Sequence, residues 1–122
     1  MSLPFYIVDV FADKKYAGNQ LAVFLDAGNL SSVEMQQIAR EINFAESTFI
    51  TKLDKENNKA EIRIFTPAQE MQFAGHPIIG TSWVLMNKIF DNSPSEIKLE
   101  VPIGPIAISK TEDLIWLKAA QP

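Results

Sequence analysis

The chain of 122 residues contains no cysteine and only one histidine, His76. Without cysteine there is no disulfide framework, no cysteine-based zinc site and no thiol catalysis. A single histidine, with no group of Asp and Glu at ligand spacing, argues against a metal site, and none is expected. The candidates for chemistry are then carboxylates, one imidazole and backbone groups.

An excess of positive charge is lacking as well. The net charge is -4, the sequence pI is near 4.9, and the lysines are scattered. Nucleic acid and anionic membrane surfaces are therefore poor candidates as partners. The first residues, Met1 to Pro4, contain no basic segment followed by an apolar run, so we expect no signal peptide and take a cytoplasmic location as the default.

The composition is that of one ordinary globular domain. Hydrophobic residues make up 47% of the chain and charged residues 21%. A length of 122 residues suits a single domain, residues 1–122, with a core of its own. No internal repeat and no low-complexity segment is present.

Alternating, β-branched and aromatic patterns predict about seven strands. They are expected at Phe5–Phe11, Leu21–Leu25, within Asn43–Thr51, and at Ala60–Thr66, Glu96–Val101, Ile106–Lys110 and Leu114–Lys118. An amphipathic helix is predicted to begin after Ser31, which forms a capping box with Glu34, and to end near Ile42.

The second predicted helix, Pro77–Phe90, carries no charge before Lys88. A helix that is apolar nearly all round is buried on most sides. Its length of about 21 Å is too short to span a bilayer. Proline suits the first helical position, so His76 is predicted as the N-cap, and Gly75 allows a close approach of the backbone.

The predicted elements indicate an α+β fold. An apolar helix needs an apolar surround, and curved antiparallel strands can supply it. We therefore expect a curved, mostly antiparallel sheet wrapped around a central apolar helix, with Trp83 and Met86 in its core.

Glu46 is the first candidate catalytic residue. It lies between Phe44 and Phe49 at a helix-to-strand junction, where partial desolvation would raise its pKa and let it both take and give a proton. From the residues alone, the plainer interpretation is preferred: an exposed acidic side chain at a junction.

The second candidate site is the start of the apolar helix. Backbone N–H groups there favour a substrate carboxylate or an oxyanion, which makes Gly75 a candidate for substrate binding. The same positive end favours a neutral imidazole, so His76 is a candidate proton shuttle or hydrogen-bond donor. A histidine that merely caps the helix is an equal alternative. Asn19 could place a polar side chain in a cleft or could simply be part of a turn.

Several motifs together resemble the phenazine-biosynthesis PhzF-like family. The resemblance covers essentially the whole chain in the family's order and spacing, although Gln20 stands where the family often has proline. The motifs are Val8–Phe11, Gly18–Val23, Asn43–Phe49, Arg63–Pro67 and Phe73–Pro77 followed by Gly80 and Thr81.

The resemblance implies a diaminopimelate-epimerase-like fold, in which two similar domains each wrap a sheet around a helix and enclose the active site between them. It implies a cofactor-free isomerase that moves a proton on a carboxylate-bearing substrate, with Glu46 as the acid/base group and Gly75-His76 as the histidine motif. Racemases of the same fold use a pair of cysteines, which this chain lacks, and this favours the glutamate-based branch.

The resemblance ends at Trp116–Pro122, which is similar to the family's crossing from first to second domain. The chain is therefore interpreted as equivalent to the N-terminal half, with the second domain absent. One wall of a cleft cannot enclose a substrate. We expect a second domain, a partner chain or a homo-oligomer to complete it, and a non-catalytic binding or assembly module is the alternative.

Overall fold

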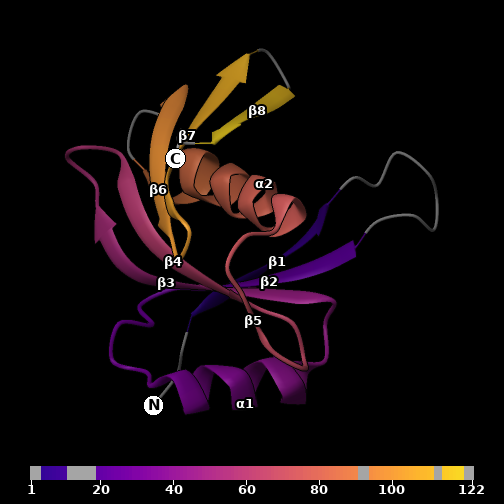
Figure 1. Cartoon of the computed structure of the whole chain (residues 1–122). Helices are drawn as coiled ribbons and strands as arrows, with labels where there is room; N and C mark the ends of the chain where they lie inside the picture. The colour runs from indigo at the N-terminus through magenta and orange to yellow at the C-terminus, as the bar shows by residue number, and fades with distance from the viewer. Residues whose placement is uncertain (1–3, 11–18, 91–93, 112–113, 120–122) are drawn as a thin grey trace.

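The computed structural model describes residues 4–10, 19–90, 94–111 and 114–119 (Figure 1). Its elements are β1 (Phe5–Val10), β2 (Asn19–Phe24), α1 (Ser32–Ile42), β3 (Glu46–Asp54), β4 (Lys59–Phe65), β5 (Glu70–Met71), α2 (Gly75–Val84), the π-helical turn η1 (Leu85–Ile89), β6 (Glu96–Val101), β7 (Gly104–Thr111) and β8 (Leu114–Ala119). Phe11, most of the predicted loop before Asn19, and the predicted turns at residues 91–93 and 112–113 lie outside the described residues.

All strands belong to one sheet with the order β1-β2-β3-β4-β6-β7-β8, and β5 pairs with β4. The pairing is antiparallel except between β2 and β3 and between β4 and β6. The sheet curves around α2, and α1 lies against its outer face (Figure 1). The predicted α+β class, a mostly antiparallel sheet around an apolar helix, is confirmed.

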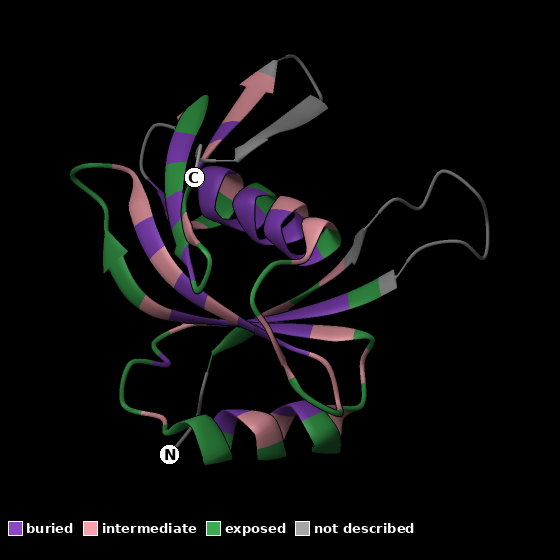
Figure 2. Cartoon of the chain, viewed as in Figure 1, coloured by how far each residue is buried: buried purple, intermediate pink, exposed green. Residues whose placement is uncertain are grey.

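The core has two parts, one on each face of the sheet (Figure 2). The inner core lies between the sheet and α2 and includes Leu21, Ile50, Ile64 and Ile78. The outer core lies between the sheet and α1. Its aromatic members are Phe24, Phe49 and Phe65, with the first two rings stacked at 4.9 Å and the last two edge to face at 5.4 Å.

Helix α1 follows the predicted capping chemistry. The Glu34 N–H donates to Ser31 Oγ at 3.1 Å, and the Ser31 N–H donates to Glu34 Oε1 at 2.8 Å. Asn43 ends the helix in the left-handed region with φ of 57°, a conformation that asparagine tolerates better than most residues. The predicted start and end of this helix are confirmed.

Helix α2 begins earlier than predicted. Its N-cap is Ala74, not His76, because Ala74 is extended (φ -155°, ψ 125°) and its carbonyl already accepts the Ile78 N–H at 3.3 Å. Gly75 is the first helical residue, and Pro77 is the third. Proline still fits there, because a first-turn N–H has no partner within the helix.

The other corrections concern short or orientation-dependent features. Trp83, expected in the core, is 42% exposed, whereas Met86 is fully buried as predicted. The chain after Val84 forms a π-helical turn in which the Phe90 N–H donates to the Leu85 carbonyl at 2.7 Å. The two-residue strand β5 was also not predicted.

Among the described helices, none combines the length and apolarity that crossing a bilayer requires.

Candidate functional site

The predicted site residues come from the starts of three elements. Asn19 begins β2, Glu46 begins β3 and Gly75 begins α2. In Figure 1 the N-terminal end of α2 lies at the same end of the molecule as the starts of β2 and β3. Leu21 and Glu46 are register partners in the parallel β2–β3 ladder, so the two strand starts are adjacent.

Glu46 is half-buried and lies on the face of the sheet that is turned toward α2. Side chains alternate between the faces of a strand, so Glu46 and Ile50 share one face. Ile50 packs in the inner core, which α2 completes. Phe49 points the other way into the outer core, against which Phe44 also packs. Both rings that neighbour Glu46 in the sequence therefore pack against the outer core, on the face of the sheet away from α2.

The start of α2 offers an open approach. His76 is exposed and Gly75 is half-buried. A methyl group built on Gly75 would meet no heavy atom outside its own helix segment within 4 Å. The backbone at Gly75 is thus accessible at the positive end of the helix, where a carboxylate is favoured. For Asn19 the structure describes the backbone only, and its role in binding stays a prediction.

Four buried hydroxyls lie in the same two elements, β3 and α2, and two of them, on Thr48 and Thr81, bear on the inner face. Thr48 belongs to the α2-facing side of β3, two residues from Glu46, and Thr81 is in α2. Neither Oγ1 atom has a hydrogen-bond partner within the described part of the chain. Buried hydroxyls without a partner are uncommon in folded proteins. The inner face near the candidate site is therefore more polar than the apolar sequence of α2 suggests.

The segment that leads into α2 is held in place by side chains that the sequence reasoning did not single out. Arg63 on β4 forms an ion pair with Glu70 on β5, and its Nη2 also donates to Ser32 Oγ at 2.9 Å. The hydrogen bond to Glu70 raises the pKa of Arg63 above its usual value. Gln36 Nε2 donates to the carbonyls of Thr66 and Pro67 at 3.0 and 3.2 Å. These contacts attach the segment between β4 and α2 to α1 and β4, and so determine where α2 begins.

A model of the phenazine biosynthesis-like protein family matches residues 8–121. The chain belongs to this family. It is 45% identical over 103 residues to the trans-2,3-dihydro-3-hydroxyanthranilate isomerase of Pseudomonas fluorescens, covering 84% of the chain and 36% of that protein. It is 42% identical over 102 residues to an uncharacterized isomerase of Mesorhizobium japonicum, and this match covers 84% of the chain and 34% of that protein.

The crystal structure of a phenazine biosynthesis protein of the PhzF family from Enterococcus faecalis has the same fold as this chain. The TM-score is 0.83 at 34% identity, and the match covers 96% of this chain and 44% of that one. The PhzF-type, diaminopimelate-epimerase-like fold expected from the motifs is confirmed. The chain spans about a third of the length of the curated isomerases named above.

Proposed function

We propose that this chain forms one wall of the active site of a cofactor-independent PhzF-type isomerase, as the equivalent of the family's N-terminal domain. Glu46 is the general acid/base, His76 assists it, and the backbone at Gly75, with Asn19, binds a carboxylate of the substrate. The observation that supports this most is the position of Glu46 on the α2-facing side of β3, at the end where α2 begins.

The proposed reaction is a proton shift. The Glu46 carboxylate removes a proton from one carbon of the substrate, and the resulting carboxylic acid returns a proton to another carbon, so that a double bond moves and no cofactor is consumed. A carboxylate bound at the N-terminus of α2 would hold the substrate beside Glu46. The substrate class is a small carboxylate-bearing compound, in keeping with the isomerases among the relatives.

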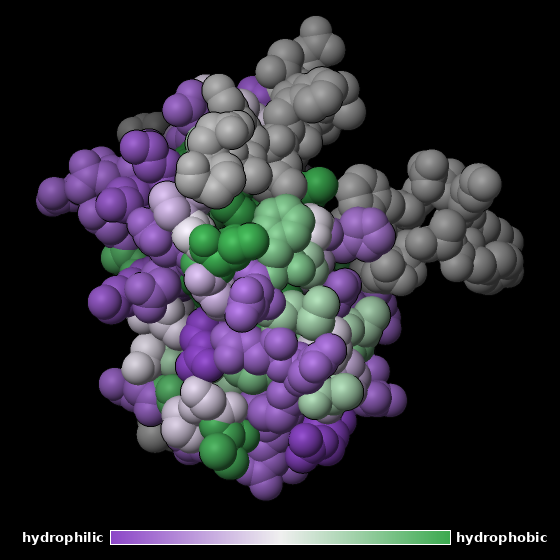
Figure 3. Space-filling model, in the orientation of Figure 1, coloured by the Kyte–Doolittle hydropathy of each residue, from purple (hydrophilic) through white to green (hydrophobic). Residues whose placement is uncertain are grey.

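The cleft needs a second wall. We infer that a second domain or partner chain covers the α2 end of the sheet and excludes water from the reaction. Apolar side chains gather at the surface over α2 in Figure 3. Trp83 on α2 is 42% exposed, and Phe73, just before the helix, is 36% exposed. Exposed apolar side chains of this size are suited to an interface. A homo-oligomer is one way to cover them.

A chimera tests the proposal. This chain replaces the matched segment of the Pseudomonas fluorescens isomerase, and turnover of trans-2,3-dihydro-3-hydroxyanthranilate is measured. We expect activity that Glu46→Gln lowers by about 10³-fold while circular dichroism stays unchanged. Glu41→Gln, on the exposed face of α1, is the control and leaves turnover unaltered. Full turnover in Glu46→Gln would remove this residue from the mechanism.

The alternative function is a non-catalytic binding or assembly module, which the exposure of Trp83 also suits. A folded chimera that binds the substrate but does not convert it would favour this alternative. In that case Glu46→Gln would leave every measured property of the chimera unchanged.

A further inference from the structure

A separate hollow lies at the opposite end of the central helix from Glu46 and His76. Its volume is about 260 Å³, and it is lined by the residues directly after β2, by the second half of β3 with the first residue of the turn that follows it, and by η1. Helix α2 and η1 contain 10 and 5 residues, so their far ends are about 20 Å apart. The hollow is therefore distinct from the proposed acid/base site.

The floor of the hollow is apolar. It is made by Leu25, Ile50, Leu53 and Ile89. Ile50 is almost fully buried, whereas Leu53 is 40% exposed, so hydrocarbon is accessible at the surface of this concave site. A small hydrocarbon group placed there would remove both surfaces from water, which is favourable in proportion to the apolar area buried.

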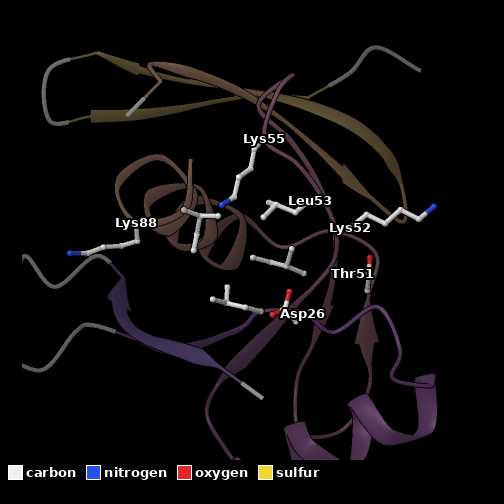
Figure 4. Close-up of a pocket in the computed structure, with 9 residues that line it drawn as sticks. Asp26, Thr51, Lys52, Leu53, Lys55 and Lys88 are labelled. Carbon is white, nitrogen blue, oxygen red and sulfur yellow. The ribbon is translucent and has the colours of Figure 1, made fainter. Parts of the chain in front are cut away.

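Charges around the floor are unbalanced. Lys52, Lys55 and Lys88 line the hollow, against one carboxylate, Asp26. This local excess of positive charge occurs in a chain whose net charge is -4. In Figure 4 the Lys55 ammonium is turned in toward the apolar side chains, whereas Lys52 and Lys88 extend away from them. Lys55 is thus the cation positioned to meet a bound anion.

Three irregularities of the backbone converge on this hollow. Asp26 has a φ of 53°, the β3–β4 ladder shifts register between Ile50 and Lys52, and η1 is a π-helical turn. Bulges and π-helical turns redirect side chains and occur often beside functional sites. Here they set the directions of side chains that form the wall and the floor.

We propose that the hollow is a binding site for a small organic anion with a branched hydrocarbon body. The Lys55 ammonium donates hydrogen bonds to the ligand's carboxylate, and the hydrocarbon lies on the floor formed by Leu53 and Ile89. Lys52 and Lys88 add long-range attraction to an anion. The site is independent of the proposed isomerase chemistry.

The test uses 4-methylpentanoate as the probe, titrated into the ¹⁵N-labelled chain while amide NMR shifts are recorded. We expect saturable shifts at Leu25, Leu53 and Ile89, with a dissociation constant on the order of 1 to 10 mM for so small a ligand. Gly75 should not shift. Lys55→Gln is expected to weaken binding about tenfold, through loss of a charge-assisted hydrogen bond.

Matched controls separate charge from shape. Lys98→Gln, on the exposed side of β6, should bind the probe as the unaltered chain does. The amine with the same carbon skeleton, 4-methylpentylamine, should not bind. Leucine should bind more weakly than the probe because its ammonium faces the lysines. Equal binding of the amine, tighter binding of leucine, an unaffected Lys55→Gln variant, or no saturable shift in this concentration range would each overturn the proposal.

Discussion

Arg63 and Glu70 are joined by two parallel hydrogen bonds, from Nε to Oε2 at 2.8 Å and from Nη2 to Oε1 at 2.6 Å. The pair connects β4 to β5, directly before the chain enters α2. Both side chains are more than two-thirds buried, so water screens the pair less than it screens a fully exposed one. This ion pair holds in place the segment that leads into α2, the helix that contains His76.

Removing this pair is expected to loosen the entry segment. Glu70→Gln should lower the free energy of unfolding by about 1 kcal/mol, because a bidentate charged contact is replaced by a neutral one. Urea denaturation measures the loss, and hydrogen exchange should rise at residues 66–74. Glu96→Gln, exposed on β6, is the control. Equal exchange in both variants would show that the pair does not hold this segment.

Gly75→Ala separates folding from ligand binding. The added methyl group meets open space, and alanine is the better helix former, so we expect stability to rise by about 0.4 to 1 kcal/mol. The same methyl group would occupy the approach to the backbone that the proposed substrate carboxylate needs. In the active chimera, the KM should increase while thermal stability does not fall. An unchanged KM would contradict the proposed role of Gly75.

Asp54 should titrate below its usual pKa of 3.8, chiefly because the Asn57 side-chain amide donates to it at 2.8 Å. A carboxyl whose folded pKa is lowered contributes stability above the unfolded pKa and loses it as pH falls through the folded value. The contribution is therefore fully present above pH 3.8, decreases as the pH falls below 3.8, and is gone once the pH is below the lowered pKa of the folded state. Carboxyl ¹³C NMR checks this, and Asn57→Ala should move the pKa of Asp54 upward.

Trp83 should contribute to self-association of the chain. It is 42% exposed on the central helix, and large apolar surface of this kind is favourable to cover. Trp83→Lys is expected to shift the chain toward monomer in analytical ultracentrifugation. Val33→Lys is the matched control, because Val33 is 74% exposed on α1 at the outer face. The interface would lie elsewhere if both variants sedimented like the unaltered chain.

Local chemistry made much of the fold predictable. The Ser31–Glu34 capping box fixed the start of α1, because both hydrogen bonds form within one turn. Alternation located β6, whose Ile97, Leu99 and Val101 are all buried. The start of α2 was harder to predict, because Ala74 caps it with backbone alone and leaves no side-chain signal.

The features that the sequence did not predict depend on distant partners. A helix with apolar residues on every side gives no indication of which flank faces outward, so the exposure of Trp83 could not be predicted. Strand β5 exists because β4 is there to pair with it. Glu46 was identified from its motif, but its orientation toward α2 depends on strand parity and on the helix packed against that face.

The two parallel pairings have a consequence for folding. The β3–β4 hairpin lies at the centre of the sheet, flanked by β2 on one side and β6 on the other. The hairpin closes over a short turn, whereas each flanking pair must first close a long loop that carries a helix. We therefore expect the hairpin to nucleate the native state, so that β3, which begins with Glu46, forms before the helix bearing His76 docks.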